Sequence, residues 1–223
     1  MPRIHRLNGT NLALVAVFAA LIAASTIWGG YPLGGGVPIT LQTFAVLLAG
    51  AVLGAYRGAS AVLVYLILGT AGAPIFSGHK GGPGVWTGAT AGFLAAFVVA
   101  AFVTGWLTER LVARGRPAFS GFLGATVVGS FVVVDLIGWG WVAVRAHLDF
   151  NATLAALTPF LPGDAIKAFL AAGVATAVNA AYPQILARGV GEVIPATGAP
   201  ATAGSATSAA GKSERSKAAT AAK

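Results

Sequence analysis

The segment from Val37 to Arg57 restricts the possible folds of this chain more than any other part of it. It begins with one proline and three polar side chains, Thr40, Gln42 and Thr43, and then runs without a charge to the arginine at its far end. A helix on the surface of a soluble core would carry a polar face every three to four residues, and this run shows none. The segment therefore predicts a membrane-crossing helix with a polar mouth, where a small-molecule site could begin.

The composition extends this interpretation to the whole chain. Hydrophobic residues make up 57% of it and charged residues 9%, against about 25% charged in typical soluble domains. The net charge of +8 comes from basic residues in short loops and tails, so it does not indicate nucleic-acid binding. The absence of cysteine excludes thiolate metal sites, and the three histidines lack ligand spacing. We expect a multi-pass protein of the cell (plasma) membrane with no metal and no cofactor.

Recurring apolar runs predict an all-α integral membrane fold with six transmembrane helices. We place these helices at residues 12–28, 40–55, 58–71, 88–107, 119–144 and 163–187. The first could instead be a signal peptide, but its uncharged run is long for one. The third is short for a bilayer crossing, so it is either tilted little or continued by the corner at 72–74.

The predicted organisation has three parts. Residues 1–11 form a cytoplasmic N-terminal segment, 12–187 the six-helix membrane domain, and 188–223 a cytoplasmic tail. The tail is rich in Ala, Thr, Ser, Gly and Lys from about residue 195 and has few large apolar side chains. Such a composition cannot bury enough surface to fold, so we expect disorder there.

Basic residues predict the orientation of the helices. With six spans, both termini lie on one side, together with eleven of the lysines and arginines. The opposite side receives only Lys80, Arg145 and Lys167. By the positive-inside rule, both termini are cytoplasmic, an N-in and C-in topology.

Asp164 and Lys167 are the first candidates for a binding site. They follow Pro162 at the start of the last predicted span and, three residues apart, share one helical face. Ionisable side chains inside a membrane are costly and are functional candidates for that reason. The simpler alternative is that Asp164 complements the helix N-terminus while Lys167 extends to the membrane surface.

Other candidates have two open interpretations each. Asp135 either faces the bundle interior as a ligand, proton or hydrogen-bonding group, or lies shallower because its span breaks near residues 138–140. Gln42 and Thr43 could hydrogen-bond a ligand or join helices. The aromatic residues of the two glycine-rich external connections could stack on a ligand ring or anchor at the interface. These are Tyr31, Phe76 and Trp86, whereas Trp28, Trp139 and Trp141 are assigned to the interfacial belt.

Small residues recur every four positions in the first span, at Ala16, Ala20 and Ala24. This spacing lets another helix approach closely. From the spacing alone, packing inside the chain is the favoured use, and contact with a partner is the alternative.

No enzyme centre is evident: the sequence has neither a Ser–His–acid candidate nor a nucleotide-binding P-loop. Two rival classes remain besides a binding subunit. One is an integral-membrane enzyme that uses Asp135 or Asp164 as acid or base. The other is a self-sufficient secondary transporter of a small carboxylate, which would be expected to show inverted repeats.

Several motifs resemble the BioY family of biotin-specific S components of energy-coupling-factor (ECF) transporters. They are Val-Pro-Ile-Thr-Leu-Gln-Thr at 37–43, Leu-Ala-Gly-Ala-Val-Leu-Gly at 48–54, Arg57-Gly58, Tyr65-Leu-Ile-Leu-Gly69, Pro74-Ile-Phe76, Gly81-Gly82, Gly88-Ala-Thr90-Ala-Gly92-Phe and Leu161-Pro-Gly-Asp164-Ala-Ile-Lys167. The resemblance covers roughly Leu12 to Ala187. Near residue 88 the family usually has Gly-Pro-Thr-Gly-Gly-Tyr, and Ala89, Ala91 and Phe93 depart from it here.

This resemblance implies the ECF S-component fold, biotin as ligand and import as function, without catalysis. It implies as partners a transmembrane coupling subunit and two ATPase subunits, which alone use ATP, and it assigns Ala16, Ala20 and Ala24 to the coupling subunit. It also implies that Asp164 and Lys167 help to bind biotin. The full predicted substrate-binding set is Asp164, Lys167, Gln42, Thr43, Phe76, Trp86, Thr90 and Lys80.

Overall fold

The computed structural model describes residues 9–26, 31–32, 37–115 and 118–186. All of them belong to one unit, Met1–Gly191. The predicted tail at 188–223 lies outside the described residues, as does most of the predicted segment at 1–11.

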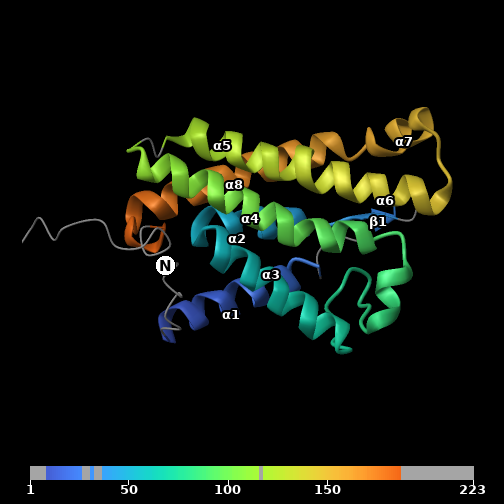
Figure 1. Ribbon diagram of the computed structural model, residues 1–223, viewed down its shortest axis with the longest axis horizontal. Helices are drawn as coiled ribbons and strands as arrows, with labels where there is room; N and C mark the ends of the chain where they lie inside the picture. The colour runs from blue at the N-terminus through green and yellow to red at the C-terminus, as the bar shows by residue number, and fades with distance from the viewer. Residues whose placement is uncertain (1–8, 27–30, 33–36, 116–117, 187–223) are drawn as a thin grey trace, which may run out of the picture. The chain divides into compact units, whose positions relative to one another are not determined.

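Helices make up most of the described chain (Figure 1). Its first half contains α1 (Gly9–Ala24), α2 (Gln42–Leu53), α3 (Ala55–Thr70), the 3-10 helix η2 (Pro83–Thr87) and α4 (Ala91–Ala113). Its second half contains α5 (Phe119–Val127), the π-helix η3 (Val128–Asp135), α6 (Leu136–Ala146), α7 (Phe150–Leu157) and α8 (Leu161–Ala181). The two-residue strands β1 (Tyr31–Pro32) and β2 (Pro38–Ile39) pair antiparallel just before α2.

Three continuous helical stretches are long and apolar enough to cross a membrane: α4, the run Phe119–Ala146 from α5 through α6, and α8. Helices α1, α2 and α3 are apolar but shorter. The 16 residues of α1 or α3 rise about 24 Å, less than the roughly 30 Å of a hydrocarbon core. Length and composition thus identify three spans, and the count of six stays a prediction.

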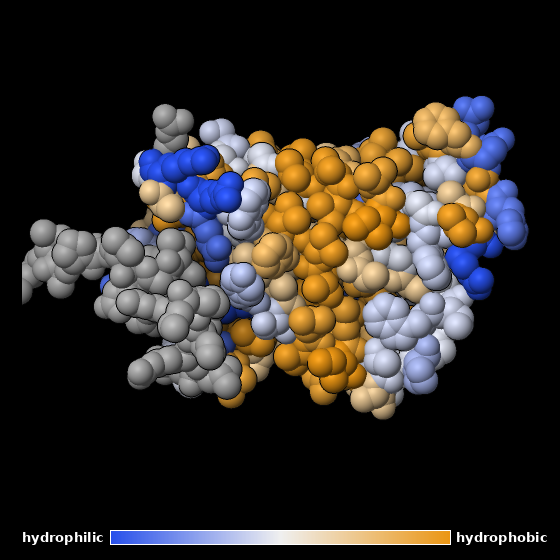
Figure 2. Space-filling view, viewed as in Figure 1, coloured by the Kyte–Doolittle hydropathy of each residue, from blue (hydrophilic) through white to orange (hydrophobic). Residues whose placement is uncertain are grey.

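The outer surface of these helices is apolar. Figure 2 shows a band of hydrophobic side chains across the middle of this face, with hydrophilic side chains at both ends of the helices. Large exposed apolar side chains include Val17, Ile67, Val132, Leu136 and Phe169. An exposed apolar surface of this extent is suited to lipid and not to water.

Hydrogen bonds show which helix ends meet at one end of the bundle. The Arg57 guanidinium, at the junction of α2 and α3, donates to Asn11 Oδ1 of α1 over 3.3 Å and to the Ile185 carbonyl beyond α8. The backbone N–H of Ala55 donates to Oε1 of Glu109, near the end of α4, over 3.0 Å. The start of α1, the α2–α3 junction and the ends of α4 and α8 therefore lie together.

The opposite helix ends are also joined. Thr26, just after α1, donates to the Ile75 carbonyl beyond α3 over 3.0 Å. Trp141 of α6 donates its indole N–H to the Gly88 carbonyl before α4 over 3.0 Å. The chain therefore reverses direction at each step through α1, α2, α3, α4, the α5–α6 run and α8.

Glycines bring the central helices close together. At Gly50 of α2, the space for a β-carbon is occupied by the backbone of Ala101 in α4. At Gly105 of α4, it is occupied by the backbone of Gly54 and Ala55. Helix α2 is consequently buried along almost its whole length, and it packs against α4.

Several predicted helix limits need correction. Helix α3 ends at Thr70, and Gly72 has a φ of +118°, so the 72–74 corner does not continue it. Helix α8 ends at Ala181 instead of near 187, because Pro183 disfavours helical backbone at the residue before it. Helix α7 was not predicted, although Asp149 caps it by accepting a hydrogen bond from the Ala152 N–H over 2.7 Å.

Candidate ligand-binding site

A cavity lies at the end of the bundle where α2, α4 and α8 begin. Its volume is about 90 Å³, below the roughly 300–1,000 Å³ of typical small-molecule sites. Most of the predicted substrate-binding set lines it, namely Gln42, Thr43, Phe76, Lys80, Thr90, Asp164 and Lys167. The structure thus brings together side chains from four separate parts of the sequence.

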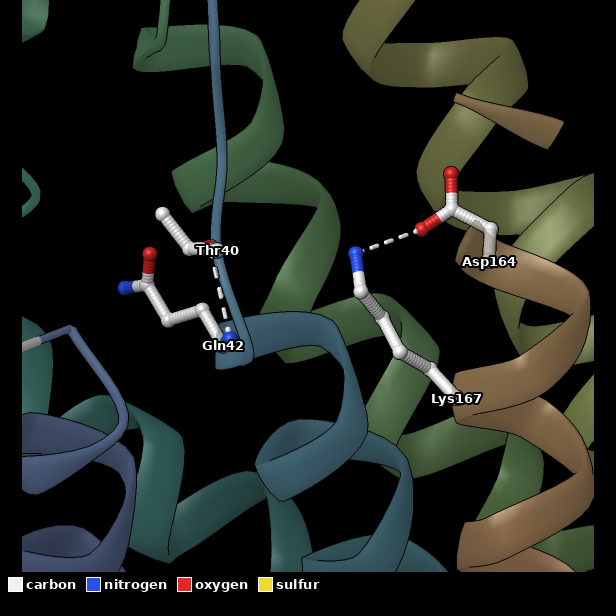
Figure 3. A network of polar contacts seen from close by, with 4 residues as sticks. All are labelled: Thr40, Gln42, Asp164 and Lys167. Carbon is white, nitrogen blue, oxygen red and sulfur yellow. Dashed lines mark hydrogen bonds and ion pairs between the residues drawn. The ribbon is translucent and has the colours of Figure 1, made fainter. Parts of the chain in front are cut away.

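Asp164 and Lys167 form an ion pair in the cavity wall. Pro162 occupies the first turn of α8, where its missing N–H costs nothing, and Asp164 follows in the same turn. Lys167 Nζ lies 2.9 Å from Asp164 Oδ1, and Figure 3 shows the two groups pointing toward each other. The two residues are only 5% and 7% exposed. The alternative in which Lys167 extends to the membrane surface is therefore wrong: its ammonium stays inside, beside the carboxylate.

Gln42 opens α2 on the other side of the cavity. Its backbone N–H donates to Thr40 Oγ1 over 3.3 Å, which holds the lead-in strand against the helix start (Figure 3). Its side-chain amide donates to the hydroxyl of Tyr65 in α3. Both Gln42 and its neighbour Thr43 are buried. Gln42 therefore joins two helices and lines the cavity at once, so its two interpretations are not exclusive.

The glycine-rich connection after α3 supplies Phe76 and Lys80. Their backbones pair, with the Phe76 N–H donating to the Lys80 carbonyl over 2.9 Å, and the turn between them uses a φ of +73° at Gly78. This conformation favours glycine, which has no β-carbon. The buried Phe76 ring meets Tyr65 edge to face at 5.4 Å. Phe76 is thereby fixed as a wall, while Lys80 is exposed at the rim.

Of the remaining predicted residues, Thr90 lines the cavity and Trp86 does not. Thr90 lies just before α4 and lines the cavity. Trp86 belongs to η2 and is not part of the lining: its indole N–H donates to Thr70 Oγ1 at the end of α3 over 2.9 Å. In this structure, Trp86 anchors the connection behind the cavity. The side chain of Tyr31 and all of Trp28 lie outside the described residues.

An aromatic wall was missed at the sequence level. Trp139, assigned there to the interfacial belt, is 2% exposed and lines the cavity. Its ring packs edge to face on Phe160 at 5.0 Å and on Phe93 at 5.7 Å. Gly138 makes room for the Phe93 ring. The position of Trp139 four residues after Asp135, on the same helical face, was the signal that could have revealed it.

Asp135 also lines the cavity, from the last residue of η3. It is 5% exposed, and its Oδ2 atom has no hydrogen-bond partner among the described residues. The helix continues as α6 through Gly138 and Gly140, so the alternative of a broken span with a shallow Asp135 is wrong. Asp135 faces the interior.

The cavity therefore combines carboxylate acceptors, an ammonium donor, amide and hydroxyl groups, and aromatic walls. Such a lining can bind a small molecule that has both N–H and carbonyl groups and an apolar body. No group of three or more His, Asp or Glu side chains in the described parts of the chain is placed to hold a metal ion.

The small-residue stripe of α1 lies away from the cavity and away from the bundle. Ala16, Ala20 and Ala24 are all exposed, whereas Ala19 and Ile22 pack inward. The preference for internal packing drawn from spacing alone was therefore wrong for this chain. The stripe is an outer surface.

The comparisons with known proteins agree with one another. A model of the BioY family matches residues 3–184. The "Biotin transporter BioY" of Rhizobium etli is 42% identical over 182 residues, which cover 80% of this chain and 97% of that protein. The protein of the same name from Rhodobacter capsulatus is 42% identical over 188 residues, covering 80% and 98%. The crystal structure of the S-component for biotin from an ECF-type ABC transporter superposes with a TM-score of 0.73 and 26% identity, covering 77% of this chain and 92% of that one.

The fold and the cavity define a helical membrane protein with a polar small-molecule site between apolar helices, built like an ECF S component. Within that class, the chain belongs to the BioY family.

Proposed function

We propose that this chain is the substrate-binding membrane subunit of a biotin uptake system, an S component that works with an ECF coupling module. The observation that carries the proposal is the buried Asp164–Lys167 pair in the wall of the cavity. A family of biotin transporters and a buried site of suitable chemistry point to the same ligand.

The chemistry of biotin matches the lining. Its ureido ring offers two N–H donors and a carbonyl acceptor, its thiophane ring is apolar, and its valerate ends in a carboxylate. Asp164 accepts from one ureido N–H, and Lys167 donates to the ureido carbonyl. Phe76 and Trp139, which both line the cavity, cover the apolar ring in this proposal. Lys80, at the rim, is placed for the valerate carboxylate.

Binding of labelled biotin to the purified chain in detergent tests this function directly. We expect saturable binding at one site, displaced by unlabelled biotin. Lipoate is the matched control, because it has the same valerate chain but no ureido ring, and it should not compete. Displacement by lipoate at equal concentration, or no biotin binding at all, would contradict the proposal.

The proposed topology has six membrane-crossing helices with both termini in the cytoplasm. The alternation of helix direction supports it, as does the collection of Arg57 and Arg110 at one helix end and of Lys80 and Arg145 at the other. The short helices α2 and α3 lie against the longer α4, and α1 lies against α2 and α3. The lead-in to α2 adds buried length at Val37. The proposed location is the cell membrane.

Cysteine labelling tests this topology, because the natural chain has no cysteine to interfere. Gly82→Cys and Arg114→Cys lie in connections at opposite ends of the helices. We expect a membrane-impermeant thiol reagent on intact cells to modify Gly82→Cys only. Arg114→Cys should react only after the cells are opened, and labelling of both from one side would exclude the six-span arrangement.

The proposed partners are a transmembrane coupling subunit and two ATPase subunits, with α1 as the surface that meets the coupling subunit. In this proposal the chain itself has no catalytic activity and no cofactor. Uptake into vesicles with and without ATPase subunits separates it from a self-sufficient transporter, which would import biotin without them.

A further inference from the structure

Asp135 carries a buried carboxyl group that takes no part in the biotin contacts proposed above. It lines the cavity, it is 5% exposed, and its Oδ2 atom has no hydrogen-bond partner among the described residues. A carboxyl group removed from water without a hydrogen bond destabilises the protein. A bound ligand can supply the missing donor.

Asp135 is the last residue of a π-helix that packs against α4 and α8. Segment η3 has i→i+5 hydrogen bonds and ends at Asp135. The buried residues of η3 are Gly129, Ser130, Val133, Val134 and Asp135, and this face packs against α4. Gly129 permits it, because a β-carbon there would overlap Thr104 of α4. Single π turns within α-helices are common at functional sites.

The charges opposite Asp135 lie on α8, which packs against η3. Asp135 interacts electrostatically with both Asp164 and Lys167. Lys167 is already hydrogen-bonded to Asp164 over 2.9 Å. Lys80 is the other charged side chain in the described lining. The cavity thus presents two carboxylates and one ammonium at its buried end.

We propose that Asp135 accepts a hydrogen bond from the second ureido N–H of biotin, a role that rests on the proposed function. A urea presents N–H, C=O and N–H along one edge. Its complement is acceptor, donor, acceptor, which Asp135, Lys167 and Asp164 supply from two facing helices. Hydrogen bonds to ionised groups are the stronger kind, and Asp164, which is paired with the Lys167 ammonium, supplies one of them.

A cycle of protein and ligand changes tests the assignment. The probes are biotin and two analogues, each carrying a methyl group on one ureido nitrogen. Asp135→Ala removes the acceptor and leaves space for a methyl group. We expect this variant to bind biotin about tenfold or more weakly. The analogue methylated on the nitrogen that faces residue 135 should bind Asp135→Ala with the same affinity as biotin. The other analogue should bind it more weakly than biotin, by the same factor as in the wild type.

Ser130→Ala is the matched control, since Ser130 is buried in the same π-helix but does not line the cavity. Its biotin affinity should equal that of the wild type. If Asp135→Ala does not fold, Asp135→Asn replaces it in the same measurements. The affinity difference between biotin and the analogue methylated next to residue 135 should then change in the same direction, by a smaller amount. Equal losses for biotin and both analogues would assign Asp135 to charge balance alone and overturn the inference, as would unchanged binding. A wild-type chain that does not bind biotin would instead contradict the proposed function.

Discussion

Asp164→Asn and Lys167→Met are each expected to weaken biotin binding by about ten- to hundredfold. A hydrogen bond to a charged group contributes roughly 1.5–3 kcal/mol, and about 1.4 kcal/mol corresponds to one decade of affinity. Asp164→Asn keeps the shape and replaces a charged acceptor by a neutral one. Lys167→Met removes the ammonium and keeps most of the stem. Equilibrium binding of labelled biotin to each purified variant measures the effect.

The double variant distinguishes ligand contact from mutual pairing. The two side chains bond each other over 2.9 Å inside the protein, so either single change leaves one buried charge without its partner. If they serve only each other, the double variant regains biotin binding. If both contact biotin, it binds at least as weakly as the weaker single variant, which is the result we expect. Recovered biotin binding in the double variant would contradict the assignment of Asp164 and Lys167 as ligand contacts.

Asp149→Asn is the control for loss of an acid at the same end of the bundle. Asp149 is exposed and caps α7 without lining the cavity. Asparagine keeps a side-chain oxygen that can accept the Ala152 N–H, so the replacement should leave both the stability of α7 and the biotin affinity nearly unchanged. Thermal unfolding in detergent, measured for all variants, separates loss of fold from loss of ligand contact.

Helix positions were predictable because a long uncharged apolar run in the sequence indicates a helix buried in the membrane. The runs that became α2, α4 and α8 illustrate this. Their ends were less predictable, since they depend on single residues such as Gly54, whose φ of +87° separates α2 from α3. The π-helix could not be predicted, because its register depends on the contact of Gly129 with α4 and not on any local preference.

The candidate site was predictable where one short motif carries its chemistry. Asp164 and Lys167 share a helical turn, so their proximity follows from spacing alone. Asp135 and Trp139 join them only through tertiary packing of the α5–α6 run against α4 and α8. Trp86 shows the reverse case: an aromatic residue in a glycine-rich loop suggested ligand contact, and in this structure its indole N–H donates to Thr70 Oγ1.

Ala20→Trp is expected to abolish ATP-dependent biotin uptake while binding by the isolated chain persists. Ala20 is exposed on α1, in line with Ala16 and Ala24, so a larger side chain there meets no other part of the described bundle. In the proposed complex, the coupling subunit approaches this stripe closely, which small residues permit and an indole ring prevents. Uptake into cells that express the complete transporter, together with binding to the purified variant, measures both quantities.

Ala177→Trp is the matched control, because Ala177 is an exposed alanine on α8, another lipid-facing helix. It should keep both binding and uptake, since added bulk facing lipid blocks no partner. Equal loss of uptake in the two variants would mean that any enlarged outer surface impairs transport, and α1 would lose its assignment. Loss of biotin binding in Ala20→Trp would place the effect inside the chain. Loss of uptake in Ala20→Trp alone, with binding intact, identifies α1 as the surface that contacts the coupling subunit and so couples ATP hydrolysis by the partners to release of the bound vitamin.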